Sequence, residues 1–167
     1  ILKALKQMGA KINIKNRRFL SGEIVADLDV QYSELIGCEL NADMAKLMID
    51  EYPILSVAAA FANGQSIFRG LGELKVKESD RLELIKLNLL RCGCECKIIN
   101  DDLIIKPSNS FVPLNTNIRT DFDHRIAMSF IVMGTKIGNL KIDDITSINT
   151  SFPNFIDTFN KAGGNLL

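Results

Sequence analysis

The residues best suited to chemistry form a polar segment, Lys75–Arg81, which packs two lysines, two acids, a serine and an arginine into seven positions. The apolar residues that follow recur at helical spacing: Leu82, Ile85, Leu89 and Leu90. A helix is therefore expected here, with Ser79 or Asp80 as its N-cap, after a short strand that ends near Val76. Free N–H groups and the helix dipole favour anions at such a start. The segment is either a solvated charged cap or part of an anion-binding site.

Three other predicted helix starts contain unusual polar sets: Asp50, Asp123-His124-Arg125, and Thr150-Ser151. If these helices repeat in space, their N-termini face the same way and build one cationic, anion-receptive face. Arg81 and Arg125 suit bidentate binding of phosphate or carboxylate, and Lys77 acts as a point charge. The set favours a small molecule that bears several negative charges.

The same residues also have purely structural interpretations. Asp50 and Asp123 fit helix N-caps, a role that stabilises a helix by about 1 kcal/mol. A lone histidine such as His124 is more often structural than catalytic. Gly70-Leu71-Gly72 lacks the third glycine of a dinucleotide-binding fingerprint, so no nucleotide cofactor is indicated.

The composition is that of an ordinary soluble globular domain, with 47% hydrophobic and 24% charged residues in 167. Twenty basic residues balance twenty acidic ones, so neither nucleic acid nor a membrane surface is expected as a partner. The longest apolar run, 54–62, is about half of what a membrane span needs, and no signal peptide is visible. Because residue 1 is Ile, the chain is expected to be a fragment or a processed piece.

The four cysteines are expected to be reduced and structural. Cys92, Cys94 and Cys96 alternate along a predicted strand, and Cys38 lies far upstream. A zinc site needs Cys-x-x-Cys knuckles or histidine ligands, and the chain has a single histidine, so no metal is expected. Reduced cysteines indicate the cytoplasm.

A helix, a glycine stop and a strand occur in the same order three times, around Gly9, Gly93 and Gly163. Two helices that start with Asp and have Ser six residues later are each followed by a strand, at 65–69 and 139–142. Further strands are expected at 18–20, 23–30 and 35–40, a hairpin at 97–105 and a loop at 107–117. We therefore expect a layered α/β (α+β) fold in one domain, 1–167, with a partial first repeat at 1–14 and fuller repeats at about 15–100 and 101–167.

Four motifs together resemble the enolpyruvyl transferase family, and within it the EPSP synthases (3-phosphoshikimate 1-carboxyvinyltransferases). The motifs are Met48-Ile49-Asp50-Glu51-Tyr52-Pro53, Lys77-Glu78-Ser79-Asp80-Arg81-Leu82, Asp123-His124-Arg125-Ile126-Ala127-Met128-Ser129-Phe130 and Thr150-Ser151-Phe152-Pro153. The resemblance covers nearly the whole chain. It implies one lobe of a two-lobed fold in which each lobe has three βαβαββ units and the substrates bind between the lobes. The lobe with the amino-terminal motifs is then a missing partner.

The resemblance implies the reaction as well as the fold. It is the transfer of the carboxyvinyl (enolpyruvyl) group of phosphoenolpyruvate to the 5-hydroxyl of shikimate 3-phosphate, with release of phosphate, in chorismate and aromatic amino acid biosynthesis. Neither metal nor organic cofactor is implied. The chain alone supplies half of such an active site and is expected to be inactive.

Roles carry over from the family motifs residue by residue. Asp50 resembles the catalytic aspartate beside the 5-hydroxyl, and Lys77 the lysine that contacts the same hydroxyl. Glu78 resembles the glutamate that transfers a proton at the phosphoenolpyruvate methylene. Arg81 and Arg125 resemble the arginines that bind phosphoenolpyruvate, with His124 beside them.

Two positions depart from the pattern of many members, which have Lys in place of Thr150 and Asn in place of Glu73. Two alternatives to an EPSP synthase lobe stay open on the sequence. One is a UDP-N-acetylglucosamine enolpyruvyl transferase, which shares the architecture. The other is a non-catalytic remnant or a single-lobe module that binds anions.

Overall fold

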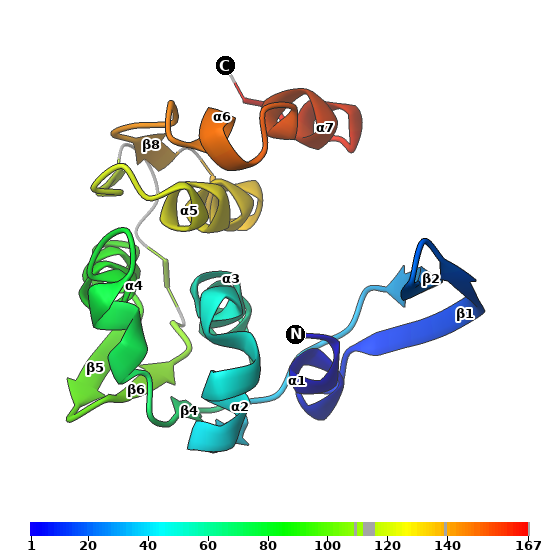
Figure 1. Cartoon of the computed structure of the whole chain (residues 1–167). Coiled ribbons are helices and arrows are strands. Elements are labelled where there is room, and N and C mark those ends of the chain that lie inside the picture. The colour runs from blue at the N-terminus through cyan, green and yellow to red at the C-terminus, as the bar shows by residue number, and fades with distance from the viewer. Residues whose placement is uncertain (109, 112–115, 139, 167) are drawn as a thin grey trace.

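The computed structural model describes residues 1–108, 110–111, 116–138 and 140–166, which contain helices and three small sheets (Figure 1). The N-terminal part contains α1 (Leu2–Gln7) and a hairpin of β1 (Lys11–Leu20) and β2 (Glu23–Gln31). The central part has ten elements: β3 (Glu39–Leu40), α2 (Ala42–Met48), the 3-10 helix η1 (Ile49–Glu51), α3 (Tyr52–Ala60), β4 (Ser66–Phe68), the 3-10 helix η2 (Gly72–Val76), α4 (Arg81–Arg91), β5 (Glu95–Ile99), β6 (Asp102–Lys106) and β7 (Thr116–Ile118). The chain then forms α5 (His124–Ile137), β8 (Leu140–Ile142), α6 (Ile148–Ser151) and α7 (Phe155–Lys161).

The β1–β2 hairpin projects from the rest of the molecule in Figure 1. Ser21 and Gly22 both have positive φ, 50° and 91°, which forms the tight turn that suits the twist of a hairpin. One face of the ribbon is polar and has the ion pairs Lys15–Asp29 and Arg18–Asp27. The opposite face is apolar and largely uncovered: Phe19, Ile24 and Val30 are 74%, 75% and 63% exposed.

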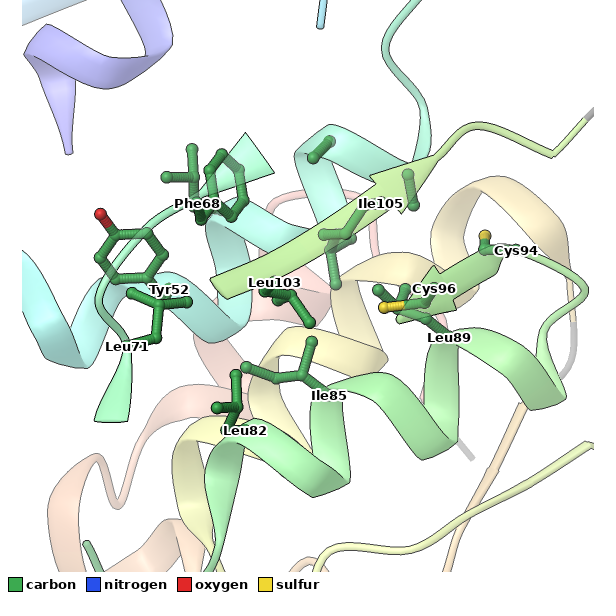
Figure 2. Close-up of a cluster of buried hydrophobic side chains, with 14 of the residues drawn as sticks. Tyr52, Phe68, Leu71, Leu82, Ile85, Leu89, Cys94, Cys96, Leu103 and Ile105 are labelled. Carbon is green, nitrogen blue, oxygen red and sulfur yellow. The ribbon is translucent and has the colours of Figure 1, made fainter. Parts of the chain in front are cut away.

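The core lies between the four-stranded sheet and the helices α3 and α4. The strand order is β3-β4-β6-β5, with β3 parallel to β4 and the other neighbours antiparallel. In Figure 2, Leu82, Ile85 and Leu89 of α4 face Cys96 and Leu103 of the β5–β6 hairpin. This buried apolar surface fixes where α4 begins, and so where Arg81 sits.

The α5 helix joins the central part to the C-terminal part. It packs against α3 and α4 on one side and against β8 and α6 on the other. Strands β7 and β8 pair in parallel, and a smaller apolar cluster forms around Ala127, Ile131 and Ile148. The N-terminus of α5 is thereby held next to those of α3 and α4.

The layered α/β fold is confirmed, and so are the three helix–glycine stops. Gly9, Gly93 and Gly163 have φ of 91°, 87° and 99°. Each donates its N–H to the carbonyl three residues back, and the next residue donates to the carbonyl five residues back. The repeat boundaries at about 15–100 and 101–167 remain a prediction.

Four sequence expectations about secondary structure are wrong. The segment before Lys77 is the 3-10 helix η2 and not a strand. Strand 35–40 is only β3 plus one bridge from Ile36 to Asn63. Residues 164–166 form no strand after Gly163, and the expected loop at 107–117 ends in β7, with 109 and 112–115 outside the described residues. The three expected strands are short, and a short run of apolar residues does not distinguish a strand from other local structure.

The cysteines are free, as expected, but they do not share one strand. Cys92 is the C-cap of α4, Cys94 follows the glycine turn, and Cys96 alone lies in β5. Burial raises the pKa of Cys92 to about 11 and those of Cys94 and Cys96 to about 12. In the part of the chain that the structure describes, no helix is long and apolar enough to cross a membrane.

Candidate active site

The guanidinium of Arg81 lies at the centre of the polar cluster and joins three segments of the chain. Its side chain is only 1% exposed. Nε is 2.7 Å from Oδ2 of Asp123, Nη1 is 2.8 Å from Oδ1 of Asp50, and Nη2 is 2.6 Å from Oε2 of Glu78. A buried cation requires such compensation, since its desolvation is costly. The predicted site residues Asp50, Glu78 and Arg81 are therefore in direct contact.

Arg81 is placed by the way in which α4 begins. Asp80 is the N-cap, and its Oδ1 accepts the N–H of Glu83 at 3.0 Å. This choice between Ser79 and Asp80 leaves the Ser79 hydroxyl free to donate to Asp123 at 2.9 Å. Asp50, by contrast, caps no helix: it lies within η1, and its carboxylate accepts from Arg81. The N-cap interpretation of Asp50 is wrong.

Asp123 caps α5 and also contacts Arg81. Its Oδ1 accepts the backbone N–H groups of Arg125 at 2.9 Å and Ile126 at 3.3 Å, while Oδ2 faces Arg81 and Ser79. Burial alone raises the pKa of Asp123, but hydrogen bonds from Arg81, Ser79 and Arg125, together with the Arg81 charge, hold it below its ordinary value. Asp123 is thus an ionised, fully buried carboxylate.

Lys77 lies beside the same cluster. Its Nζ is 2.7 Å from Oε1 of Glu73 and 3.5 Å from Oδ1 of Asp50. The hydrogen bond to Glu73, followed by the charge of Asp50, raises the pKa of Lys77 above its ordinary value. Glu73, which stands where many family members have Asn, therefore holds this lysine one turn before α4.

Arg125 and His124 open α5. Nη1 of Arg125 donates to the backbone oxygen of Asp50 at 2.8 Å and lies 3.3 Å from Oε1 of Glu51. The Arg125 side chain, from α5, therefore contacts η1, the segment that also contains Asp50. His124 is the first residue of α5 and is half-buried, and its imidazole makes no hydrogen bond or ion pair with any residue that the structure describes.

Thr150 and Ser151 do not begin a helix. They end α6, and Thr150 donates its hydroxyl to the carbonyl of Ser147 at 2.7 Å. Helix α7 starts four residues later, after Asn154. The prediction of a fourth polar helix start is therefore wrong, because Phe152 and Pro153 lie between the two helices and not in the first turn of α7.

The charge of the cluster is mixed and not cationic. The ion pairs connect three cations, Lys77, Arg81 and Arg125, to five carboxylates, those of Asp50, Glu51, Glu73, Glu78 and Asp123. The side chains of Asp50 and Glu78 are 41% and 52% exposed. Both carboxylates therefore pair with the Arg81 guanidinium and are also accessible to solvent. Two exposed carboxylates beside fixed cations are suited to exchanging protons with a bound anion.

The cluster is buried at Arg81 and Asp123 and reaches the surface at its outer carboxylates, those of Asp50, Glu73 and Glu78. A hollow of about 460 Å³ lies between α5, β8 and the segment from Phe159 to Leu166, away from the candidate residues. No group of three or more His, Cys, Asp or Glu side chains within the described ranges is placed to hold a metal ion.

Sequence reasoning missed four contributors to the cluster: Glu51, Glu73, Ser79 and the carboxylate of Asp123 beyond its capping role. Glu51 and Ser79 lie inside motifs that were identified, next to residues that were assigned roles. An acid directly before an arginine-containing helix was the available signal for Asp123. What the sequence lacked was the pairing between α4 and α5, 42 residues apart for Arg81 and Asp123.

Comparison with known proteins identifies relatives of this chain. The family model described as EPSP synthase (3-phosphoshikimate 1-carboxyvinyltransferase) matches residues 1–159. The 3-phosphoshikimate 1-carboxyvinyltransferases of Paramagnetospirillum magneticum and Gluconobacter oxydans are 45% and 46% identical over 167 and 163 residues. These matches cover 99% and 97% of this chain but 37% of each relative, so the chain spans little more than a third of their length.

Solved structures of enolpyruvyl transferases also resemble this chain. The EPSP synthase of Acinetobacter baumannii superposes with a TM-score of 0.91 at 37% identity, over 98% of this chain and 38% of that one. The enolpyruvyl transferase NikO of Streptomyces tendae, at 15% identity, has a TM-score of 0.68 over 98% of this chain and 35% of that one, which shows a shared fold. By its sequence and its fold, the chain belongs to the EPSP synthase family.

Proposed function

We propose that this chain forms one wall of an EPSP synthase active site and that the missing amino-terminal-motif lobe forms the other. The substrates are phosphoenolpyruvate and shikimate 3-phosphate, and the products are the 5-enolpyruvyl ether and inorganic phosphate. The reaction belongs to chorismate and aromatic amino acid biosynthesis, in the cytoplasm. By itself the chain has no turnover, since positioning two anionic substrates and excluding water needs both walls.

The reaction asks for two groups that exchange protons and for fixed positive charge. In the addition step, the 5-hydroxyl oxygen bonds to C2 of phosphoenolpyruvate and loses its proton, while the methylene carbon gains one. In the elimination step, the C2–O bond to phosphate breaks and the new methyl group returns its proton. Glu78 is assigned to the carbon proton, which it gives to the methylene in the addition and takes back from the methyl group in the elimination. Asp50 is assigned to the hydroxyl proton, which it accepts in the addition and passes to the departing phosphate in the elimination, so that the chain gains or loses no net proton.

The observation that supports these assignments is the shared guanidinium. Asp50 and Glu78 come from different segments, yet both are within 2.8 Å of Arg81 and both are about half-exposed. Lys77 stands beside Asp50, where it can stabilise an alkoxide that forms at the 5-hydroxyl. Arg81 and Arg125 supply charge for the carboxylate and phosphate of phosphoenolpyruvate.

A hybrid enzyme tests the proposal. The chain replaces the corresponding 37% of the Paramagnetospirillum magneticum relative, and phosphate release is followed with both substrates present. Glu78→Gln keeps the shape of the side chain but has no transferable proton, so turnover should fall by about 10²–10⁴-fold. Glu83→Gln is the matched control, because Glu83 is a half-exposed glutamate in the first turn of α4 that pairs with Lys86 outside the cluster.

The outcomes separate the alternatives. Activity with shikimate 3-phosphate that Glu78→Gln abolishes and Glu83→Gln keeps supports the proposal. Activity with UDP-N-acetylglucosamine instead would assign the chain to the other transferase. A folded hybrid that binds phosphoenolpyruvate without turnover would favour a non-catalytic, anion-binding remnant.

A further inference from the structure

We infer that Asp123 is a positioning residue, which turns the Arg81 guanidinium toward a bound carboxylate and sets the backbone of Arg125 at the same time. Ser79 assists by holding the Asp123 carboxylate. The inference rests on the proposed function, in which Arg81 and Arg125 bind phosphoenolpyruvate. It assigns roles to two residues that the family resemblance left without any.

The first support is that the nitrogen atoms of the Arg81 guanidinium have different kinds of partner, one of them buried and two of them half-exposed. Nε of Arg81, nearest the backbone, is bound 2.7 Å from Oδ2 of Asp123, whose side chain is fully buried. The two Nη atoms point instead at Asp50 and Glu78, which are about half-exposed. The buried contact therefore anchors one edge of the planar group and leaves the opposite edge facing the candidate site.

The second support is an incomplete hydrogen bond on that outer edge. Nη2 of Arg81 lies 2.6 Å from Oε2 of Glu78, yet it is buried and has no well-aligned acceptor among the described residues. The short distance and the missing alignment indicate a charge contact that leaves N–H bonding capacity unused. A carboxylate that displaces the half-exposed Glu78 from this edge takes up that capacity, and Arg groups favour such bidentate geometry.

The third support is the second oxygen of the same carboxylate. Oδ1 of Asp123 accepts the N–H of Arg125 at 2.9 Å, which places the first turn of α5. Nη1 of Arg125 then reaches the backbone oxygen of Asp50 at 2.8 Å. One buried side chain thus fixes both arginines relative to η1, and the Ser79 hydroxyl at 2.9 Å limits its rotation.

The competing explanation is a buried ion pair that only stabilises the fold. Asp123→Asn distinguishes the two, because an Asn oxygen can still cap α5 while its amide replaces the oxygen that faced Arg81. Asp80→Ala is the matched control: it removes the cap of α4, directly before Arg81, without removing a partner of the guanidinium. Ser79→Ala removes only the supporting hydroxyl.

The experiment uses the 167-residue chain and two NMR readouts, taken at a temperature where all variants are folded. The first is protection of the Arg81 Nε–H from solvent exchange. We expect protection in the unmodified chain, Asp80→Ala and Ser79→Ala, and its loss in Asp123→Asn. The second is titration with phosphoenolpyruvate. Asp123→Asn should bind phosphoenolpyruvate about 10- to 100-fold more weakly, as expected for a lost charge-assisted contact. Ser79→Ala should lose less affinity than that, under about tenfold.

Two results would overturn the inference: an Arg81 Nε–H that stays protected in Asp123→Asn, or an equal loss of affinity in Asp80→Ala and Asp123→Asn. A chain that does not bind phosphoenolpyruvate in any form would instead count against the proposed function. In that case the Nε–H comparison alone still decides whether Asp123 orients Arg81.

Discussion

Replacing Arg81 by Leu should destabilise this chain more than its position at the start of a helix suggests. The substitution leaves Asp123 fully buried with its charge uncompensated, with only the Ser79 hydroxyl and two backbone N–H groups as partners. Breaking a buried ion pair in this way costs about 3–5 kcal/mol. Asp50 and Glu78 are about half-exposed, so each lost contact there contributes only about 0–1 kcal/mol. A loss of about 3–5 kcal/mol is a large share of the roughly 5–15 kcal/mol of an ordinary domain.

The assay is urea unfolding of the 167-residue chain, followed by far-UV circular dichroism at neutral pH. Arg81→Leu combined with Asp123→Asn should recover much of the loss, because Asn keeps the α5 cap without a buried charge. The pKa of Asp123 is lowered in the folded chain, so the pair stabilises above the ordinary aspartate range and this contribution disappears as the pH falls below it. The difference between the unmodified chain and Arg81→Leu should therefore shrink in acid.

Two outcomes would refute this reasoning. One is an Arg81→Leu chain that loses less than about 1 kcal/mol, as expected for a surface ion pair. The other is strict additivity of the two substitutions, which would mean that Arg81 and Asp123 do not interact in solution.

Further predictions concern binding, pH and the exposed hairpin. Glu78→Gln in the lone chain should bind phosphoenolpyruvate more tightly in calorimetry, because a carboxylate that competes for Arg81 is gone, whereas weaker binding would show that Glu78 supports the site. Arg125→Ala in the hybrid should weaken the binding of phosphoenolpyruvate by about 1.5–3 kcal/mol and the binding of shikimate 3-phosphate by less. Equal losses of affinity for the two substrates would indicate a folding role. Because burial raises the pKa of Cys94 from 9.0 to about 12, the unfolded chain loses this proton first, and urea midpoints should fall as the pH rises from about 9 to 12, less so in Cys94→Ala. Phe19→Ser with Ile24→Ser should reduce binding of a hydrophobic dye by the lone chain without lowering its melting temperature, because both side chains are about three-quarters exposed.

The sequence predicted the longer elements well because their signals are local. Helix α4 has an apolar stripe, an Asp cap and a glycine stop within one stretch, and α5 has an equivalent set. The hairpins are likewise marked at their turns, at Ser21-Gly22 and at Asn100, which has φ of 57°. Each of these signals needs only neighbouring residues to be read.

The errors lie where a short segment is decided by contacts that are distant in sequence. Residues 72–76 alternate polar and apolar side chains as a strand does, but they pair with no strand of the described residues, and Leu74 is buried as part of a 3-10 helix. The sequence position of Asp50 is typical of a helix cap, but its carboxylate instead accepts a hydrogen bond from Arg81, 31 residues later. Five of the predicted site residues lie together in the structure: Asp50, Lys77, Glu78, Arg81 and Arg125. Their ion pairing, and hence the mixed charge of the cluster, depends on the packing of α3, α4 and α5.

The most direct test of the central claim is complementation between separately made parts. The 167-residue chain is mixed with the remaining portion of the Paramagnetospirillum magneticum relative, and phosphate release from phosphoenolpyruvate is followed with and without shikimate 3-phosphate. We expect no release from either part alone, and release from the mixture that depends on shikimate 3-phosphate and is lost with Glu78→Gln. Release by the lone chain would contradict the assignment of half an active site. Equal release from a Glu78→Gln mixture would contradict the role given to the cluster around Arg81.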